Sequence, residues 1–492
     1  MIKLKNLNFT YANADNGAGV HDICLSIPQG QVVLLCGTSG CGKTTLTRII
    51  NGLIPHFFDG ELSGEAIVCG KNVADSELYE LAPDVGSVFQ NPKSQFYTVQ
   101  TDSEIVFACE NIGMPKECIF RNLDETVEKL ELEPLLGRSL FALSGGQKQK
   151  IACASVSVLH PKVFVMDEPS SNLDYVGIKE LIKVIESWKN DGCTVIIAEH
   201  RLNWLIKLAD RVVYMKDGKI DRDIPIADFC KLSLSELHHK GLRGKATFDY
   251  ENNQTFKTKE KLKFERFTFT YHNTPEVNAI NIEHLEVPVG AVVGILGENG
   301  AGKSTFAHCV CGIKNKAKGK MIYSGIEFSA RERIKHCYIV MQDVNHQLFA
   351  ESVLDEMMLS LERSRLTEEE KLAMIDSTLG KLGLQSYKDS HPMSLSGGQK
   401  QRVSIACALL SDKDIIVYDE PTSGLDYGHM IEIADAVSQM QKIGKTQFII
   451  THDPELLEKC CDYFIFLKEG KVLWSGDMSE DTIEKLTSFF TY

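Results

Sequence analysis

Short apolar segments alternate along the chain with longer segments of mixed polarity, and the apolar segments end at glycine, acidic residues or histidine. The clearest of them read VVLLCG (32–37), VFVMDEP (163–169), TVIIAEH (194–200), VVGILG (292–297), IIVYDEP (415–421) and TQFIITHD (446–453). A continuously apolar strand is buried on both faces, which is typical of a parallel sheet covered by helices. The pattern therefore predicts α/β architecture, in which functional side chains gather at the carboxyl ends of the strands.

The same series of segments occurs twice, in the same order. The loop GTSGCGKTT (37–45) recurs as GENGAGKST (297–305), and LSGGQKQ (143–149) recurs at 395–401. The lysines of the two loops are 260 positions apart, whereas the later motifs are all 252 positions apart. The repeat predicts two similar domains, residues 1–239 and 262–492, joined by a polar linker at 240–261 that lacks helical periodicity.

Composition narrows the possible functions. Lys and Arg total 53 against 67 Asp and Glu, a net charge of −14, so the chain has no general attraction for nucleic acid or anionic lipid. No apolar run approaches the ~20 residues of a membrane helix, and the N-terminal MIKLKNLNFTY alternates like a strand rather than a secretory signal. We therefore expect a cytosolic chain. Its 15 cysteines should be reduced, because their odd number and scattered spacing do not indicate a disulfide framework.

Each glycine-rich loop directly follows an apolar strand and matches G-x-x-x-x-G-K-[ST], the P-loop pattern. Its glycines allow backbone N–H groups to surround phosphate oxygens, and the next helix directs its positive end toward them. Lys43 and Lys303 should reach the β- and γ-phosphates, while Thr44 and Ser304 should bind Mg²⁺. The predicted phosphate-binding residues are Gly37, Thr38, Ser39, Gly40, Cys41, Gly42, Lys43, Thr44 and Thr45, and Gly297, Glu298, Asn299, Gly300, Ala301, Gly302, Lys303, Ser304 and Thr305.

An acidic pair ends one buried strand in each half, Asp167-Glu168 in the first and Asp419-Glu420 in the second. A buried carboxylate is costly unless it has a task. Beside a P-loop, the first acid can bind in the Mg²⁺ shell and the second can polarise the attacking water. The alternative interpretation is a pair of acids that caps the next helix.

Two copies of LSGGQKQ, combined with a P-loop, D-E-P and a downstream histidine in fixed order, resemble the ATP-binding cassette (ABC) family. The resemblance covers nearly the whole chain except the linker. It implies two tandem P-loop NTPase domains, each with a mostly parallel sheet flanked by helices and a helical signature subdomain. It also implies two ATP molecules with Mg²⁺, each held between the P-loop of one domain and the LSGGQ of the other.

The resemblance assigns further residues to these ATP sites. Tyr11 and Tyr271, each 32 positions before its P-loop lysine, resemble the aromatic residue that stacks on adenine, and a core tyrosine on the first strand is the alternative. His200 and His452 resemble the switch histidine that contacts the γ-phosphate, although a histidine at a strand end can also be structural. The other implied residues are Gln90 and Gln342 of the Q-loops near Mg²⁺, Asp174 and Asp426 of the D-loops, and Ser144, Gly145, Gly146, Gln147, Ser396, Gly397, Gly398 and Gln399 of the signatures.

Neither half has lost its lysine, glutamate or histidine, so both sites are expected to hydrolyse ATP. The implied catalytic residues are Glu168, His200, Glu420 and His452, and the implied metal ligands are Thr44, Gln90, Asp167, Ser304, Gln342 and Asp419. Cys41 lies beside the start of a phosphate-binding helix, where a lowered pKa would make its thiol reactive. An unreactive packed thiol is the equal alternative.

The residues after each Q-loop glutamine resemble the ATPase components of energy-coupling-factor transporters, which take up cobalt, nickel and B vitamins. They read VFQNPKSQFYTVQTDSEIVFACENIGMP and VMQDVNHQLFAESVLDEM. This resemblance implies a transmembrane coupling subunit and a small membrane substrate-binding subunit as partners, no nucleic acid, and a peripheral place on the cytoplasmic side of the cell membrane. Two alternatives stay open: a fused sugar-importer ATPase, which usually has one degenerate cassette, and a soluble twin-cassette ATPase that acts on ribosomes, which usually has a long charged linker.

Overall fold

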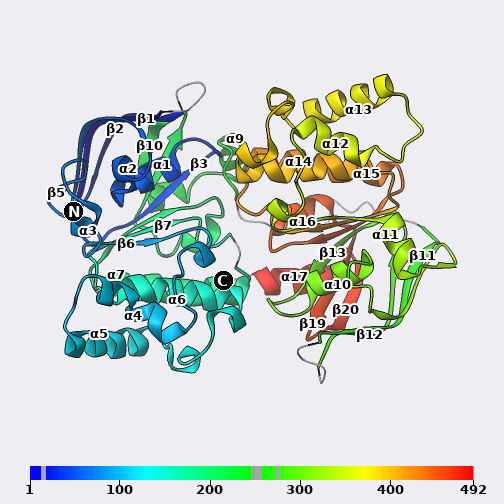
Figure 1. Cartoon of the computed structure of the whole chain (residues 1–492), viewed down its shortest axis with the longest axis horizontal. Coiled ribbons are helices and arrows are strands. Elements are labelled where there is room, and N and C mark those ends of the chain that lie inside the picture. Colours follow the sequence, from blue (N-terminus) through cyan, green and yellow to red (C-terminus); the bar gives the residue numbers. More distant parts are fainter. Residues whose placement is uncertain (13–17, 172, 245–247, 249–257, 273–276, 491–492) are drawn as a thin grey trace. The chain divides into compact units, whose positions relative to one another are not determined.

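The computed structural model describes residues 1–12, 18–171, 173–244, 248, 258–272 and 277–490. Two compact units divide the chain, unit 1 at residues 1–245 and unit 2 at residues 246–491 (Figure 1). The two units repeat the same succession of strands, as the duplicated motifs predict.

Unit 1 contains two sheets. Its strands are β1 (Ile2–Tyr11), β2 (Gly19–Ile27), β3 (Val32–Gly37), β4 (Gly60–Val68), β5 (Lys71–Asn72), β6 (Val85–Val88), β7 (Val163–Asp167), β8 (Thr194–Ala198), β9 (Arg211–Lys216) and β10 (Lys219–Pro225). Its helices are α1 (Lys43–Ile50), α2 (Leu53–His56), α3 (Leu78–Leu81), α4 (Thr101–Asn111), α5 (Lys116–Lys129), α6 (Gly145–Ser157), α7 (Tyr175–Asn190), α8 (Ile226–Phe229) and α9 (Leu234–His239). One sheet has the order β10-β9-β3-β8-β7-β6 and is parallel except at β10, and the other, β2-β1-β4-β5, is antiparallel.

Unit 2 has the same two-sheet plan. Its strands are β11 (Lys261–Thr270), β12 (Asn278–Pro288), β13 (Val292–Leu296), β14 (Lys318–Tyr323), β15 (Ile326–Glu327), β16 (Cys337–Val340), β17 (Ile415–Asp419), β18 (Thr446–Ile450), β19 (Tyr463–Lys468) and β20 (Lys471–Asp477). Its helices are α10 (Lys303–Val310), α11 (Ala330–His336), α12 (Val353–Ser360), α13 (Glu368–Lys381), α14 (Gly397–Leu410), α15 (Tyr427–Lys442), α16 (Pro454–Cys460) and α17 (Glu480–Phe490). The sheet orders are β16-β17-β18-β13-β19-β20 and β12-β11-β14-β15.

The predicted α/β architecture is confirmed. The apolar segments named above form β3, β7, β8, β13, β17 and β18, which lie next to one another at the centres of the two mostly parallel sheets. Every residue of β3 and β8 is buried, because α6 and α7 cover one face of the sheet, and α1 together with the antiparallel sheet covers the other. The carboxyl ends of β3, β7 and β8 therefore meet at one edge, where the polar residues that follow them gather.

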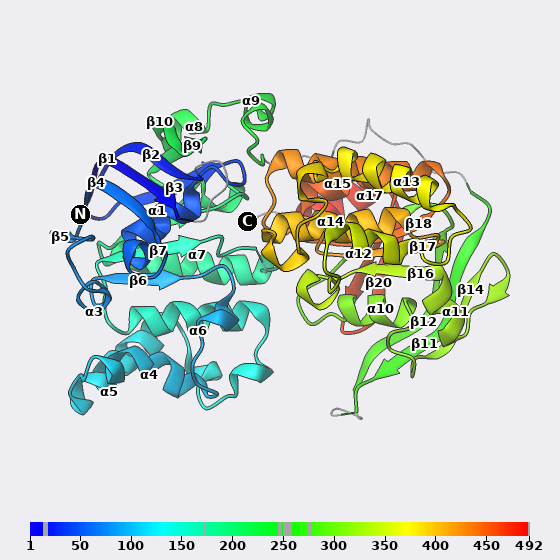
Figure 2. The same ribbon diagram turned by 45° about the horizontal axis from the view of Figure 1, so that its top comes forward.

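A helical region and the antiparallel sheet lie at opposite ends of unit 1. Figures 1 and 2 show α4, α5 and α6 gathered at one end, with β1, β2 and β4 at the other. Unit 2 has the equivalent helices α12, α13 and α14. The helical region begins with α4 after the Q-loop and ends with α6, whose first residues are those of the signature.

Part of the predicted linker belongs structurally to unit 1. Leu242 is buried in the core of that unit, and Tyr214 Oη donates a hydrogen bond to the Lys240 carbonyl at 2.9 Å. The polar composition of the segment does not predict this packing, because a single buried leucine attaches its first residues to unit 1. Residues 245–247 and 249–257 of the predicted linker region lie outside the described residues.

Within the described residues, no helix combines the length and the apolar character needed to cross a membrane. All 15 cysteines are free thiols, and most are buried, in agreement with the prediction of packed, reduced residues.

Candidate active site

Both P-loops need glycine at the end of the strand that precedes them. Gly37 has a φ of 151°, and a Cβ at this position would lie 2.2 Å from the Met215 carbonyl oxygen. Gly297 has a φ of 143°, and a Cβ there would lie 2.2 Å from the Leu467 carbonyl oxygen. A side chain at either position would push the loop off the neighbouring strand, so the glycine fixes how closely the loop follows the sheet.

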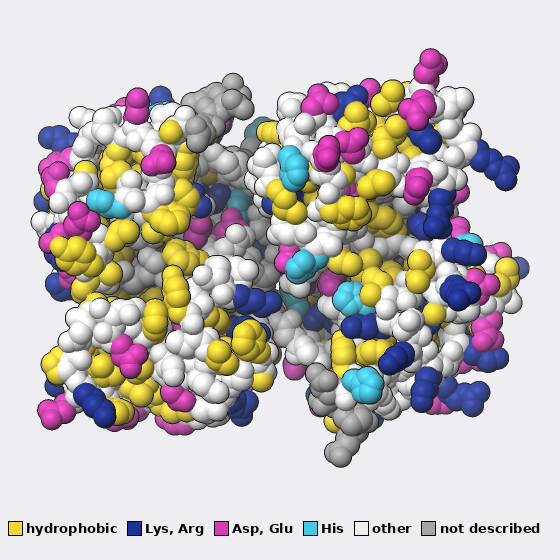
Figure 3. Space-filling view, in the orientation of Figure 1, with side chains coloured by type: hydrophobic (Ala, Val, Ile, Leu, Met, Phe, Trp, Pro, Cys, Tyr) yellow, Lys and Arg dark blue, Asp and Glu magenta, His cyan; other side chains and the backbone are white. Residues whose placement is uncertain are grey.

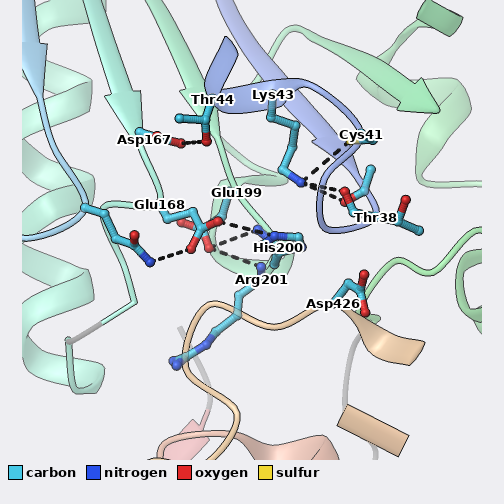
Figure 4. Close-up of polar contacts among 12 residues, drawn as sticks. Thr38, Cys41, Lys43, Thr44, Asp167, Glu168, Glu199, His200, Arg201 and Asp426 are labelled. Atoms are coloured by element: carbon cyan, nitrogen blue, oxygen red, sulfur yellow. Dashed lines mark hydrogen bonds and ion pairs between the residues drawn. The ribbon is translucent and has the colours of Figure 1, made fainter. Parts of the chain in front are cut away.

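The P-loop lysines are buried, and each donates hydrogen bonds to backbone carbonyls of its own loop. Lys43 Nζ donates to the carbonyls of Gly37 at 2.9 Å and Thr38 at 3.1 Å (Figure 4). Lys303 Nζ donates to the carbonyls of Gly297 at 2.6 Å and Glu298 at 3.0 Å. Each ammonium therefore lies in the curve of its loop at the start of α1 or α10, the place where phosphate oxygens bind in P-loop proteins.

A hydroxyl and a carboxylate meet beside each lysine. Thr44 Oγ1 donates to Asp167 Oδ1 at 3.2 Å, and Ser304 forms the same hydrogen bond with Asp419. Burial, followed by the charge of Glu168, raises the pKa of Asp167 to about 6, and burial also raises the pKa of Asp419. A carboxylate whose charge is disfavoured by burial gains from a cation beside it.

These residues fit Mg²⁺ bound together with a nucleotide. Hydroxyl and carboxylate oxygens are hard ligands that suit Mg²⁺, which usually takes one or two protein ligands and keeps positions for water and phosphate. The described residues contain no cluster of three or more His, Cys, Asp or Glu side chains with metal-binding geometry, which would be needed for a cage built by the protein alone. Thr44 with Asp167, and Ser304 with Asp419, would hold the ion.

The glutamate that follows each of these aspartates has an unusual backbone. Glu168 has a φ of 46° and Glu420 a φ of 51°, in the left-handed region that non-glycine residues seldom adopt. Each is fixed there because its N–H donates to the neighbouring strand, to Ala198 or to Ile450, at 2.8 Å. The same backbone conformation at both glutamates gives the two carboxyl groups equivalent positions at the ends of β7 and β17.

The switch histidines face these glutamates. His200 Nε2 lies 3.3 Å from Glu168 Oε1, and His452 Nε2 lies 3.8 Å from Glu420 Oε1. Gln90 Nε2 donates to Glu168 Oε2 at 2.8 Å, which brings the Q-loop to the same carboxylate (Figure 4). Burial acts to raise the pKa of Glu168, but the hydrogen bond from His200 and the charges of His200, Lys43 and Arg201 outweigh it and lower the pKa below its ordinary value. Glu168 is therefore ionised at neutral pH.

A model of the ABC transporter family matches residues 20–171 and 280–423, which include both P-loops, both signatures and both acidic pairs. The chain belongs to the ABC transporter family. Units 1 and 2 are therefore its two cassettes, and it is an ABC ATPase that binds ATP.

Relatives and solved structures extend the likeness over almost the whole chain. A protein of Treponema denticola, provisionally named an ABC transporter ATP-binding protein, is 43% identical over 482 residues, which is 96% of each chain. A solved structure titled RNase-L Inhibitor is 22% identical, with a TM-score of 0.66, covering 99% of this chain and 93% of the other. An archaeal ribosome recycling factor, solved in complex with a ribosomal stalk protein, is 23% identical, with a TM-score of 0.63, covering 98% and 92%. At these identities the two structures show the twin-cassette fold alone.

The predicted adenine-stacking tyrosines lie next to the P-loop helices of the cassettes. Tyr11 Oη lies 3.2 Å from Thr45 Oγ1 and accepts a hydrogen bond from Arg48 at 3.1 Å, while Tyr271 Oη lies 3.0 Å from Thr305 Oγ1. Both rings also pack edge-on against the phenylalanine two residues earlier. The structure thus joins each tyrosine to its P-loop, while stacking on adenine stays a prediction.

The signature and D-loop residues form helix caps in their own cassettes. Ser144 and Ser396 cap α6 and α14, where each serine hydroxyl accepts from the N–H of the glutamine three residues later. Asp174 caps α7 and Asp426 caps α15 by accepting from the N–H of residues 177 and 429. These caps leave the N–H groups of Gly145, Gly146, Gly397 and Gly398 at helix starts, the arrangement that favours an anion. Their contact with a second cassette's ATP stays a prediction, as does metal binding by Gln90 and by the exposed Gln342.

The expectation of a lowered pKa for Cys41 is wrong. Cys41 is buried in the P-loop, and burial raises the pKa of its thiol, although the charge of Lys43 and the hydrogen bonds from Lys43 oppose this. The favourable start of the helix is too weak to offset the loss of water around the sulfur. Cys41 is therefore the packed, poorly reactive thiol of the two alternatives.

Sequence reasoning missed one titratable residue of the first site. Glu199 follows β8, is only 2% exposed and lies next to Glu168 (Figure 4). Burial, followed by the charge of Glu168, raises the pKa of Glu199 to about 7. A comparison of the two repeats could have drawn attention to Glu199, because the residue before the switch histidine is Glu199 in the first cassette and Thr451 in the second.

Proposed function

We propose that the chain is the ATP-hydrolysing subunit of a membrane transporter of the energy-coupling-factor type, which imports a vitamin or a metal ion. It would lie on the cytoplasmic side of the cell membrane through two partners, a transmembrane coupling subunit and a small substrate-binding subunit. Two ATP molecules would bind between the cassettes, each held by the P-loop of one and the signature of the other. The proposal rests on the duplicated catalytic residues and, above all, on a duplicated apolar surface.

Each cassette exposes large apolar side chains at the same place in its fold. In the first apolar patch, Tyr97 is 78% and Phe141 81% exposed, and Val99 and Phe107 lie beside them. In the second apolar patch, Phe349 is 78% exposed, with Leu359 and Met393 also exposed. Tyr97, Phe107 and Phe141 correspond to Phe349, Leu359 and Met393 in the repeat, 252 positions later. Apolar side chains do reach the surface of both units in Figure 3.

The members of the first apolar patch form one surface. The Tyr97 ring stacks on Phe107 of α4, with ring centroids 5.1 Å apart. The Leu140 N–H donates to the Val99 carbonyl at 2.9 Å. This bond joins the segment that carries Phe141, the residue after Leu140, to the segment that carries Tyr97. Contiguous exposed aromatic residues of this kind are typical of a surface that a protein partner covers.

The first apolar patch is joined to the catalytic carboxylate through the Q-loop. Tyr97 follows Gln95, whose side chain is bonded to the backbone of Phe89 at 3.4 Å and Ser87 at 3.2 Å. Gln90, which lies between Phe89 and Gln95 in sequence, donates a hydrogen bond to Glu168. A partner seated on the patch would therefore be coupled to the ATP site through a short bonded segment, which is what a transporter subunit requires.

The chemistry that we propose for the site is hydrolysis of ATP to ADP and phosphate. Glu168 and Glu420 would accept a proton from the attacking water, and the switch histidines would orient them. The P-loop N–H groups, together with Lys43 and Lys303, would stabilise the charge that develops on the phosphate oxygens. Bound Mg²⁺ would neutralise negative charge on the β- and γ-phosphates.

The two alternatives have less support. A fused sugar-importer ATPase usually carries one degenerate cassette, whereas both cassettes here retain lysine, glutamate and histidine. The likeness to the archaeal ribosome recycling factor, at 23% identity, concerns the fold alone.

The test is a pull-down of the tagged chain from its native cells in mild detergent, followed by identification of the co-purified proteins. We expect two small polytopic membrane proteins with one copy of the chain. The pair Tyr97→Ser with Phe141→Ser, or Phe349→Ser with Met393→Ser, should lose the coupling subunit, whereas Tyr79→Ser, which removes an equally exposed aromatic of α3, should retain it. Recovery of ribosomal subunits, or of no membrane protein, would overturn the transporter and leave the ATPase assignment intact.

A further inference from the structure

The two cassettes differ in how the loop that carries the switch histidine is anchored. In the first cassette this loop follows β8 and reads Glu199-His200-Arg201, and in the second it follows β18 and reads Thr451-His452-Asp453. An acidic residue precedes the histidine in one cassette and follows it in the other. The three-residue segments 199–201 and 451–453 are called here the first and second switch loops.

In the first cassette, Glu199 is the anchor. Its Oε1 accepts hydrogen bonds from the N–H of His200 at 3.1 Å and of Arg201 at 3.2 Å (Figure 4). Its Oε2 accepts from the N–H of Ser170 at 3.5 Å, in the segment that follows Glu168. One buried carboxyl group therefore joins the first switch loop to the segment after the catalytic glutamate.

In the second cassette, the catalytic glutamate is itself an anchor. Glu420 Oε2 accepts from the Thr451 hydroxyl at 3.3 Å and from the His452 N–H at 3.4 Å. The histidine N–H that is bonded to Glu199 in the first cassette is thus bonded to the catalytic glutamate in the second. Asp453 replaces the contact of Glu199 with Ser170, because its Oδ2 accepts from the hydroxyl of Thr422, the counterpart of Ser170, at 2.6 Å.

We propose that Glu199 is a positioning residue that anchors the first switch loop, a task that Glu420 performs in the second cassette in addition to catalysis. The carboxylate of Glu168 instead contacts two side chains, those of Gln90 and His200. A carboxylate bonded to side chains can follow the Q-loop and the histidine when these move, whereas one bonded to the loop backbone moves with the loop. The consequence for hydrolysis rests on the proposed catalytic role of Glu168 and Glu420, while the anchoring does not.

Amide hydrogen exchange of the full chain without nucleotide tests the anchoring directly. We expect Glu199→Thr to speed exchange in the peptide 198–204 at least about fivefold, because the His200 N–H loses its acceptor. A threonine here can keep only the bond to the N–H of residue 201, as Thr451 does to the N–H of Asp453. Glu168→Ala should leave that peptide unchanged, whereas Glu420→Ala should speed exchange in the equivalent peptide 450–456. Glu104→Gln is the matched control, since Glu104 is another buried carboxyl group that accepts backbone N–H bonds, from Tyr97 and Thr98, away from the switch loops.

Steady-state ATP hydrolysis then tests whether the anchoring by Glu199 affects catalysis. Glu199→Thr should lower kcat several-fold while KM for ATP changes less than about twofold, because His200 loses its position but the P-loop is untouched. Glu199→Asp should recover part of the loss. Unchanged exchange in Glu199→Thr, or equal deprotection of peptide 198–204 in Glu168→Ala, would overturn the anchoring role. If Glu168→Gln left hydrolysis unaffected while the exchange results held, the catalytic assignment would fail and the anchoring role would stand.

Discussion

The replacement of each catalytic glutamate by glutamine is the sharpest test of the two ATP sites. Glu168→Gln and Glu420→Gln keep the size of the side chain and remove its charge. The structure places Glu168 in hydrogen-bond contact with Gln90 and next to His200, but gives it no bond to Lys43 or the P-loop backbone. The substitution should therefore affect the chemical step far more than ATP binding.

The expected loss of rate follows from the proposed role of each glutamate as a general base. A positioned general base contributes about 10²–10⁴ in rate, which is about 2.7–5.4 kcal/mol at about 1.36 kcal/mol per tenfold. We expect the rate at a substituted site to fall by about this factor, so each single variant should lose at least about half of the steady-state phosphate release, and the double variant about 10²-fold or more. The dissociation constant for ATP, measured by equilibrium binding, should stay within about threefold.

Phosphate release is measured on the purified chain at saturating MgATP, with Glu110→Gln as a control because this glutamate lies exposed on α4. A single variant that retains the full rate would show that its site does not hydrolyse ATP, and would refute the assignment of two working sites. A large loss of ATP affinity would instead show that the carboxylate holds nucleotide.

Three further predictions concern stability and reactivity. Gly37→Ala should lower the free energy of unfolding, measured by chemical denaturation, by about 2 kcal/mol or more, because its Cβ would meet the Met215 carbonyl. Gly40→Ala, with open space around its Cβ, should lower it by about 1 kcal/mol. Equal losses would contradict the steric argument. Burial raises the pKa of Glu199 to about 7, so its contribution to stability is fully present below about pH 4.5 and is lost as the pH rises through 7; Glu199→Gln should therefore gain in Tm relative to the parent chain between pH 5 and pH 8. Glu168, His200 and Arg201 surround this carboxyl group, and a pH-independent Tm difference would show that it does not titrate in this range. Maleimide should modify exposed Cys24 and Cys230 well before Cys41 in time-resolved mass spectrometry, and early labelling of Cys41 would contradict its burial.

Much of the site was predictable because its chemistry is concentrated in short contiguous segments. The P-loops require glycine and lysine at fixed spacing, and the structure brings Lys43, Thr44, Asp167, Glu168 and His200 together as that pattern predicts. The alternation in the first eleven residues likewise predicted β1. The reactivity of Cys41 could not be judged from its neighbours in sequence, because the loss of water around a thiol depends on packing by residues far along the chain.

The duplication, the central strands, the glycine loops and the identity of the acidic and histidine residues can be predicted from the sequence, because each of these depends on the local pattern of side chains along the chain. How those residues are connected depends on the folded chain. The antiparallel sheets, the inclusion of residues 240–244 in unit 1 and the left-handed backbone of Glu168 and Glu420 all depend on segments that meet after long separations. The different anchors of the two switch loops arise in the same way, since a carboxylate accepts whichever N–H groups the folded backbone presents to it.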